Sequence, residues 1–548
     1  MRKYNQVIYI LFIGCLTLIF NTKAIAQQDR FEGRWVGTAE LLPYPEFVSF
    51  SVDTLPVVRF FYNEIPSHVP KSYEFSKDTI YFEVDTDQLY AEYKGVLTSD
   101  STMEGKMTVG GEAYDCNLQR VTPASLEDIG YLLGYFQFEN GKVIQMEPFF
   151  LDGTINPLQL LDYETGKKRV IFPVYRDEQT LKFTAGKKLL TPVPLDFAVT
   201  LHMNKVGEAE RLSFTDLSGE TIPLNEGKML QNLDKQQDIS ATNGDVTLYG
   251  TITYPNSQVD KHPLVVYIPA AGQQFRGNML DEYIRLLPYY GVATLVYDKR
   301  GCGESTGNLR ESTFEDQAAD VEALLKEALK QEKIDVANVG LVGFDQAGFI
   351  MPIVASQSDE VKFIVNLSGA VVSLEEQEYG ALSNRMKADG FPEQDVKDAL
   401  AYHQQMFAYL KGDLDSVAFQ QASDAISIKP WNNYVTSFDN KDYISWWSRY
   451  YNFSPDKYWR QVNVPVLTLY GENDLIVDTD KNVQRMEKYI KKSKRSGSDV
   501  QVLKNANHLL MLGEKRGDFQ LSEIVGYEPT LFDIIINWVG SQTGLQEK

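Results

Sequence analysis

The chain has 548 residues, of which 43% are hydrophobic and 23% charged, and its formal net charge at pH 7 is −22. This length exceeds what a single hydrophobic core supports, so we expect two or three domains. The negative charge argues against nucleic acid as a partner, because phosphate-binding surfaces are rich in Lys and Arg. The 31 Tyr and 29 Phe residues favour half-buried β-strands in part of the chain.

The N-terminal segment has the three parts of a secretory signal peptide. Two basic residues follow Met1, an apolar stretch covers residues 7–20, and the small residues Ala24 and Ala26 follow. We therefore predict that residues 1–26 are removed and that the protein is exported to a bacterial periplasm, the cell surface or the medium. The apolar stretch is shorter than a membrane-spanning helix of about 20 residues, so no membrane span is expected in the mature chain. Lipidation at Cys15 is the less favoured alternative.

Two regions of short alternating strands follow this segment. Residues 28–122 predict a small β-barrel or sandwich, and the opening sequence FEGRWVG at 31–37 is similar to the first strand of a lipocalin-like barrel. Residues 126–235 predict a second small β domain. Cys116 and Cys302 fall in different predicted domains, which argues against a disulfide framework. No group of residues in either β region has metal-ligand spacing, so we predict neither a metal nor a cofactor.

The rhythm of the sequence changes at residue 245, where apolar runs begin to alternate with amphipathic stretches. This alternation predicts a mostly parallel sheet flanked by helices over residues 245–548. An amphipathic helix is predicted after Thr313, its N-cap. Residues of about 373–460 are polar, aromatic and helix-prone, and predict a helical lid that selects the substrate. The predicted strands cover residues 264–268, 293–297, 339–342, 363–366 and 466–469.

Residues 339–348, VGLVGFDQAG, have the pattern of a nucleophile elbow: an apolar strand, a sharp turn and an immediate helix. Small residues at Gly343, Ala347 and Gly348 suit this turn, because it brings the strand and helix backbones close together. Asp345 occupies the position of the nucleophile.

Two later loops supply the other groups of a hydrolytic site. The sequence VLTLYGEND ends at Asp474, just beyond a predicted strand, and VLKNANH places His508 in the next such loop. The order elbow, acid and histidine is that of α/β-hydrolases. Both loops are expected at the carboxyl ends of the strands, where ligands bind in open α/β folds.

Together these stretches resemble the α/β-hydrolase esterases related to serine aminopeptidases, in which N-terminal β domains precede the hydrolase. YDKRGCGESTG at 297–307 is similar to the YDKRGxGxSxG segment of that family, GEND at 471–474 to its acid loop GExD, and NHL at 507–509 to its histidine loop. The resemblance implies an α/β-hydrolase domain over 245–548 and hydrolysis of a small, ester-like substrate.

Two motifs differ from the family pattern. The elbow reads GFDQAG where the family has GHSEGG, so Asp345 replaces the nucleophilic serine. Residues 269–272 read PAAG where the family has HGSG at the end of its oxyanion strand. Backbone N–H groups do not depend on side-chain identity, so the resemblance still assigns the oxyanion donors to Ala271 and Gln346. It also assigns Asp474 to the orientation of His508.

Three functions are compatible with these residues. One is a carboxylic ester hydrolase with Asp345 at the nucleophile position. Another is a hydrolase similar to haloalkane dehalogenases and epoxide hydrolases, in which Asp345 attacks a carbon atom and His508 activates the water that hydrolyses the resulting ester. A third is a catalytically silent protein that binds a ligand or partner, with Asp345 and His508 as a structural ion pair. None of these functions requires a metal or cofactor.

Overall fold

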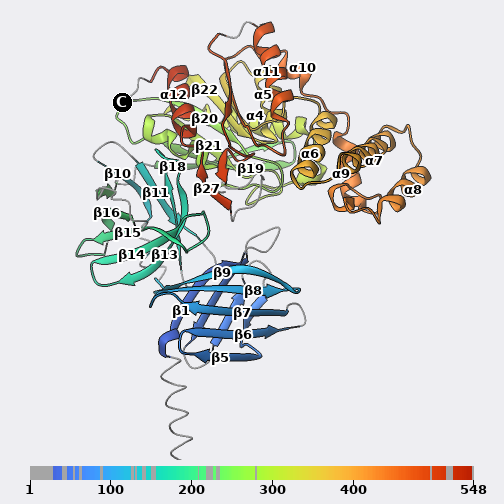
Figure 1. Cartoon of the computed structure of the whole chain (residues 1–548). Coiled ribbons are helices and arrows are strands. Elements are labelled where there is room, and N and C mark those ends of the chain that lie inside the picture. Colours follow the sequence, from blue (N-terminus) through green and yellow to red (C-terminus); the bar gives the residue numbers. More distant parts are fainter. Residues whose placement is uncertain are drawn as a thin grey trace, which may run out of the picture. The chain divides into compact units, whose positions relative to one another are not determined.

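The chain forms two compact units: residues 1–230 with 519–526, and residues 231–518 with 527–548 (Figure 1). The predicted signal segment 1–26, including Cys15, lies outside the described residues. No helix in the described part of the chain has the length and apolar character needed to cross a membrane. The computed structural model describes residues 29–39, 46–52, 56–60, 65–86, 90–124, 129, 133–138, 143–149, 156–207, 209–216, 226–229, 235–277, 281–493, 496–513 and 523–545.

The first unit opens with an antiparallel nine-stranded sheet in the order β4-β3-β2-β1-β9-β8-β7-β6-β5. The alternation in TIYFEVD of β6 places Ile80, Phe82 and Val84 in the core, where they pack with Trp35. A short 3-10 helix, η1 (Asp29–Phe31), precedes the sheet. Its strands are β1 (Gly33–Ala39), β2 (Glu46–Val52), β3 (Pro56–Phe60), β4 (Ile65–His68), β5 (Ser72–Ser76), β6 (Thr79–Asp85), β7 (Tyr90–Leu97), β8 (Thr102–Val109) and β9 (Glu112–Val121).

The second sheet of this unit is a closed eight-stranded barrel in sequential order from β10 to β17. Closure leaves no unpaired edge, since β10 pairs with β17 as well as with β11. Its interior is filled by apolar side chains that include Phe136, Leu160 and Phe183. The strands are β10 (Gly134–Phe138), β11 (Val143–Pro148), β12 (Leu158–Asp162), β13 (Lys168–Arg176), β14 (Thr180–Gly186), β15 (Leu195–Met203), β16 (Ala209–Asp216) and β17 (Glu226–Met229).

A late segment of the chain, Phe519–Gly526, belongs to the first unit. Within it, the carbonyl of Ile524 accepts a hydrogen bond from the Leu189 N–H at 2.6 Å, and the carbonyl of Val525 accepts one from the Arg169 guanidinium. The sequence had placed this whole stretch in the C-terminal domain. The local sequence pattern does not show that this segment joins the first unit, because these hydrogen bonds join residues more than 300 positions apart.

The second unit is built on an eight-stranded sheet in the order β18-β19-β21-β20-β22-β23-β24-β25. The strands from β21 to β25 run parallel, and β18 and β19 pair antiparallel at one edge. All five predicted strands lie within observed ones, so that part of the prediction is confirmed. The bounds are β18 (Lys235–Asn243), β19 (Val246–Tyr254), β20 (His262–Ile268), β21 (Ala293–Tyr297), β22 (Ile334–Phe344), β23 (Val361–Leu367), β24 (Val466–Gly471) and β25 (Asp499–Leu503).

The α/β unit begins earlier than residue 245, because β18 is its edge strand. The first four residues of β18 are exposed and polar, so the strand lacks the apolar run that marks a buried parallel strand. The second β region accordingly ends before Lys235 rather than at it.

Helices cover the sheet of the second unit. The predicted N-cap is confirmed: the Thr313 side chain accepts the Asp316 N–H in a capping box at the start of α4 (Phe314–Ala328). The other elements outside the lid are α3 (Glu282–Arg285), η3 (Leu287–Tyr290), η4 (Leu309–Glu311), α5 (Ala347–Gln357), α11 (Thr479–Ser493), α12 (Leu531–Thr543) and the short strand β26 (Met511–Gly513). Strand β27 (Ile524–Tyr527) begins in the late segment Phe519–Gly526 of the first unit.

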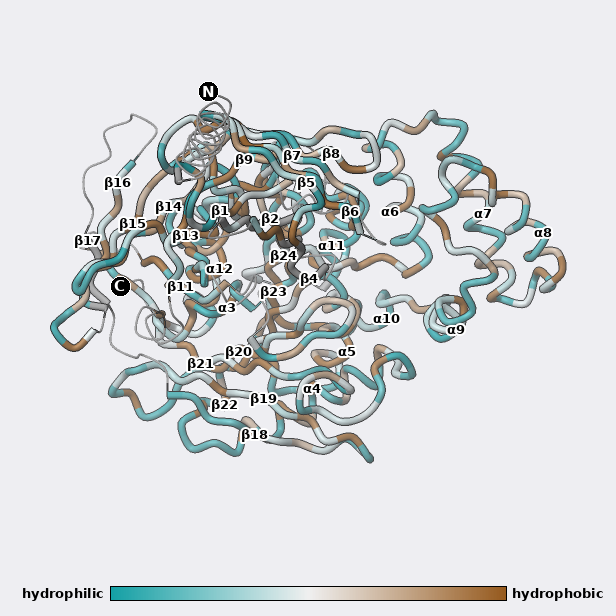
Figure 2. Tube along the Cα trace, turned by 90° about the horizontal axis from the view of Figure 1, so that it is seen from below, coloured by the Kyte–Doolittle hydropathy of each residue, from teal (hydrophilic) through white to brown (hydrophobic). Residues whose placement is uncertain are grey.

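The predicted lid is helical and lies between β23 and β24 in the sequence. Apolar and polar residues alternate along its helices (Figure 2), and α7 and α8 extend away from the sheet (Figure 1). Aromatic residues hold the lid together: Trp447 packs edge-on against Phe407, and Phe419 stacks on Tyr402. The lid consists of α6 (Leu374–Ala388), α7 (Glu393–Lys411), α8 (Ser416–Ile426), η5 (Asn432–Tyr434), α9 (Lys441–Tyr450) and α10 (Asp456–Trp459).

Candidate active site

Asp345 stands at the tip of a strained turn between β22 and α5. Its φ of 56° lies in the left-handed region, which non-glycine residues rarely adopt. The turn demands small neighbours: a Cβ on Gly343 would lie 2.4 Å from the Cβ of Ala347, and one on Gly348 would lie 2.6 Å from the carbonyl oxygen of Ala370. The turn therefore has the geometry of a nucleophile elbow, with an aspartate at its tip.

His508 connects the carboxylates of the elbow and of the acid loop. Its Nδ1–H donates to Oδ2 of Asp474 at 2.9 Å, and its Nε2 lies 3.5 Å from Oδ1 of Asp345. The Asp474 side chain is fully buried, and its Oδ1 accepts the N–H groups of Ile476 at 2.8 Å and Val477 at 2.7 Å. These contacts hold the imidazole with its Nε2 towards Asp345, whose side chain is 24% exposed.

The two predicted oxyanion donors contact the carboxylate of Asp345 itself. The Ala271 N–H donates to Oδ2 at 3.0 Å, and the backbone N–H of Gln346 donates to the same carboxylate. One carboxylate oxygen therefore lies against the Ala271 donor, while the other faces His508.

Charge and burial act in opposite directions on this pair. Burial disfavours ionisation of Asp345, but the His508 hydrogen bond and charge, with the N–H groups of Ala271 and Gln346, outweigh it and hold the pKa below its usual value. Burial alone would lower the pKa of His508. The charge of Asp474 and the contacts with both carboxylates instead raise this pKa well above its usual value. The resting site thus holds an imidazolium between two carboxylates.

The structure brings all of the predicted site residues together, namely Asp345, Asp474, His508, Ala271 and Gln346. Sequence reasoning missed two further ionisable groups. Lys299 was read only as part of a family motif, and its side chain reaches Gln346. Glu378, on lid helix α6, interacts electrostatically with Asp345, and burial raises its pKa to about 7. A helical carboxylate in a polar stretch gives no sequence signal of this kind.

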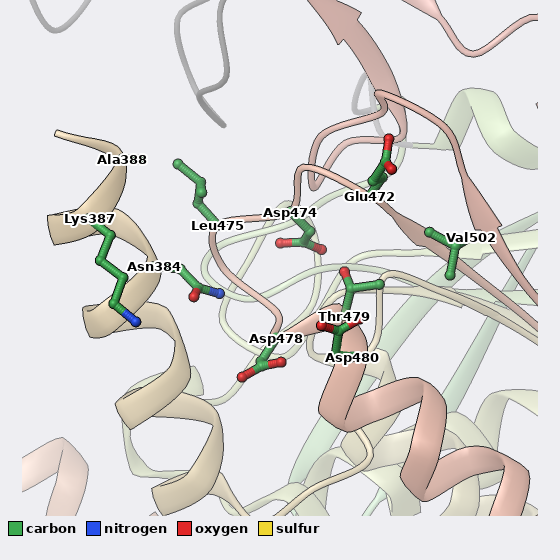
Figure 3. Close-up of a pocket in the computed structure, with 10 residues that line it drawn as sticks. All are labelled: Asn384, Lys387, Ala388, Glu472, Asp474, Leu475, Asp478, Thr479, Asp480 and Val502. Atoms are coloured by element: carbon green, nitrogen blue, oxygen red, sulfur yellow. The ribbon is translucent and has the colours of Figure 1, made fainter. Parts of the chain in front are cut away.

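A pocket of about 380 Å³ lies on the Asp474 side of the site, between α6 and the loop that follows β24 (Figure 3). Its lining includes Asp474 together with Glu472, Asp478 and Asp480, and Lys387 comes from α6. Among the described residues, no group of three or more His, Cys, Asp or Glu side chains could hold a metal ion. His262 and His403 are buried away from these loops.

Residues 263–515 match the family model described as alpha/beta hydrolase fold. The matched range contains the elbow, the acid loop and the histidine loop. With the parallel sheet and the strained turn, it defines the C-terminal unit as a domain of the α/β-hydrolase fold, preceded in the chain by β domains.

Relatives of this domain are distant. A stretch of 116 residues is 31% identical to an uncharacterized 31.7 kDa protein encoded in the traX-finO intergenic region of Escherichia coli; it covers 21% of this chain and 40% of that protein. Est1E of Butyrivibrio proteoclasticus with bound ferulic acid aligns at 15% identity and a TM-score of 0.36, covering 56% of this chain and 99% of Est1E. The Pyrococcus furiosus esterase PF2001 aligns at 17% identity and a TM-score of 0.34, covering 54% and 88% of the two chains.

Proposed function

We propose that the C-terminal unit is a hydrolase in which the Asp345 carboxylate is the nucleophile and forms a covalent ester with its substrate. The observation that carries this proposal is the difference between the contacts of the two carboxylate oxygens. Oδ2 accepts the Ala271 N–H at 3.0 Å, whereas Oδ1 has His508 Nε2 3.5 Å away. Oδ1 is the oxygen available to attack.

In the first step, Oδ1 of Asp345 attacks an electrophilic sp3 carbon of the substrate. A C–O bond forms, and the bond to the leaving group breaks with its electron pair. The product is an ester whose carbonyl oxygen is the former Oδ2, already hydrogen-bonded to the Ala271 N–H. Esterification also neutralises Asp345, which removes one of the charges that raise the pKa of His508. The imidazolium then gives its proton to the leaving group or to solvent, and neutral His508 can act as a base.

In the second step, His508 removes a proton from water and the resulting hydroxide attacks the Asp345 Cγ. Negative charge collects on Oδ2, where the Ala271 N–H stabilises it, and the Gln346 N–H donates to the same carboxyl group. Collapse of this intermediate expels the product oxygen, which takes the proton from His508, and one water oxygen stays in the Asp345 carboxyl group. The second proton of the water passes from this carboxyl group to His508, which restores the imidazolium and the carboxylate. Asp474 stabilises the imidazolium that forms in between.

Alkyl carboxylic esters fit this geometry less well than substrates with a reactive sp3 carbon. The N–H donors that would bind an ester carbonyl already bind Asp345. A carboxylate adduct of an ester carbonyl would also revert, because a carboxylate leaves far more readily than an alkoxide. The favoured substrate class therefore carries a halide, a strained ether oxygen or a similar leaving group on carbon.

The test is a single turnover in ¹⁸O-labelled water with enzyme in excess over a panel of short haloalkanes, terminal epoxides and p-nitrophenyl esters. The first product molecule should carry an unlabelled oxygen from Asp345, and the tryptic peptide 334–362 should gain one ¹⁸O. Labelled oxygen in the first product with an unchanged peptide would contradict the nucleophilic role of Asp345.

Three variants sharpen this test. His508→Gln should form the covalent ester and accumulate it, because the histidine is needed only in the second step. Asp345→Asn should form no ester. Asp359→Asn, an exposed carboxylate in the same tryptic peptide, is the matched control and should behave as the parent.

A parent chain that turns over none of these probes would favour the silent, ligand-binding alternative. Asp345→Ser then becomes informative, because an intact scaffold should hydrolyse p-nitrophenyl esters once a serine occupies the elbow. We also propose that the chain is exported, on the basis of residues 1–26. Its mature N-terminus, determined by mass spectrometry from the cells that produce it, should be near Gln27.

A further inference from the structure

Lys299 is a buried cation directly behind the oxyanion donors. It follows β21 in the loop that begins at Asp298, its residue is 3% exposed, and its own N–H donates to the Gln274 carbonyl at 3.1 Å. An ammonium group withdrawn from water this far loses most of its hydration energy, so its presence requires compensation from nearby groups.

The compensation comes from both segments that carry the oxyanion donors. Nζ donates to the carbonyl oxygen of Ala270 at 3.0 Å and to the side-chain Oε1 of Gln346 at 3.0 Å. Ala270 immediately precedes Ala271, and Gln346 immediately follows Asp345. In the described part of the chain, no carboxylate lies within ion-pair distance of Nζ. The charge of Asp345 nevertheless acts on Lys299 through the electrostatic field.

We propose that Lys299 is a positioning residue for this site, which rests on the function proposed above. Its ammonium fastens the Ala270 carbonyl to the Gln346 side chain, so that the Ala271 and Gln346 N–H groups converge on the carboxylate of Asp345. Its positive charge stabilises the oxyanion that forms there.

A purely structural role would leave a different signature. Replacing a buried cation that has no ion-pair partner by an apolar side chain of similar length removes its desolvation cost, which offsets the two hydrogen bonds lost by Ala270 and Gln346. Lys299→Met should therefore keep or raise the melting temperature of the protein while it weakens the site. Burial also lowers the pKa of Lys299 to about 8.

The two steps of the reaction separate this role from general damage. Negative charge on the Asp345 oxyanion appears only when the covalent ester is hydrolysed, so Lys299→Met should slow hydrolysis and leave ester formation largely intact. We expect hydrolysis to fall about 10- to 100-fold, less than the loss of a direct oxyanion donor causes. The covalent ester should then accumulate, as in His508→Gln.

The experiment compares the full-length parent with Lys299→Met, Lys299→Arg and the control Lys362→Met. Lys362 is an exposed lysine that also donates to a backbone carbonyl, that of Asp359 at 2.6 Å. Intact-protein mass spectrometry follows the ester formed with a haloalkane or epoxide probe. The ester should accumulate in Lys299→Met, less in Lys299→Arg, and not in Lys362→Met. Hydrolysis by the parent should slow above about pH 8, and Lys299→Arg should remove that slowing.

A second measurement does not depend on turnover. Hydrogen exchange of the backbone at residues 269–274 should be faster in Lys299→Met than in the parent, at an unchanged or higher melting temperature. Unchanged exchange in this segment would overturn the positioning role, whether or not the parent is active. So would a Lys299→Met variant that hydrolyses its ester at the parental rate. If neither the parent nor any variant forms an ester while the exchange difference is present, the proposed function alone is overturned.

Discussion

Two carboxylates at the elbow and three polar residues of the lid differ in how they are paired. Around the elbow, each carboxylate has assigned donors: Asp345 has Ala271, Gln346 and His508, and Asp474 has two backbone N–H groups and the same histidine. In the lid, both ring nitrogens of His403 and the Nε1 of Trp431 are buried without a hydrogen-bond partner among the described residues, where Glu378 likewise has neither a hydrogen bond nor an ion pair.

This difference separates chemistry from recognition. Fully paired groups hold the reacting atoms in place before a substrate arrives, which is the source of electrostatic catalysis. Buried polar groups without partners cost free energy until something binds them. His403 and Trp431 therefore have hydrogen-bonding capacity that their surroundings in the described part of the lid do not meet.

The largest expected effect comes from a substitution that changes the hydrogen bond between Asp474 and His508. In Asp474→Asn, the amide donates to Nδ1 of His508, so Nε2 must carry the proton and cannot accept one from water. Hydrolysis of the covalent ester should fall roughly 10³- to 10⁴-fold. Rapid-quench measurement of both steps checks this, and an equal loss in ester formation would show that the substitution disrupts the site more widely.

The next largest effect concerns His403 in the lid. Burial lowers the pKa of His403 to about 4, so the unfolded chain binds more protons between that value and about 6.5. The stability contributed by neutral His403 is present above pH 6.5 and is lost as the pH falls. The loss between pH 7 and pH 4.5 should be about 2 to 3 kcal/mol.

His403→Leu should remove most of that acid sensitivity, because no buried imidazole is left to protonate. Denaturant unfolding at both pH values, read through Trp fluorescence of the lid, provides the measurement. His202→Gln, in the barrel of the other unit, serves as the control and should leave the acid sensitivity of the lid unchanged. Equal acid sensitivity in His403→Leu and the parent would contradict the assignment.

Gly343→Ala tests the close approach of strand and helix at the elbow. The added methyl group would press on the Ala347 side chain 2.4 Å away, so the turn must open. We expect a loss of about 2 kcal/mol in the free energy of unfolding, as for overpacked cores. Activity should fall further than stability, because Asp345 moves with the turn. Full activity at reduced stability would show that the turn is less strictly set than its geometry indicates.

The smallest effect concerns Glu378. Burial, with the charge of Asp345, raises its pKa to about 7 although Arg385 opposes the shift. The stabilising effect of the protonated carboxyl is fully present below about pH 4.5 and is lost as the pH rises through 7. Glu378→Gln should therefore raise the melting temperature by a few degrees at pH 8 and leave it unchanged at pH 5. An equal shift at both pH values would point to packing rather than charge.

The strands of the α/β unit and the elbow could be predicted from sequence, because buried parallel strands are continuous apolar runs and the turn requires small residues in fixed order. The polar edge strand β18 has neither signal. The contact between Lys299 and Gln346 joins residues 47 positions apart, and its meaning depends on where two loops meet. The position of Asp345 could be predicted, but the hydrogen bonds that its carboxylate accepts from Ala271 and Gln346 required coordinates.

The late segment that joins the first unit has a consequence for synthesis on the ribosome. The first unit completes its hydrogen bonds to Leu189 and Arg169 only after residues 524 and 525 have emerged, near the end of translation. Its N-terminal sheets can fold earlier. A protein expressed from residue 231 onwards would carry Ile524 and Val525 without Leu189 and Arg169. Gene truncation at residue 231 thus leaves these two carbonyl groups without the donors that they have in the full chain.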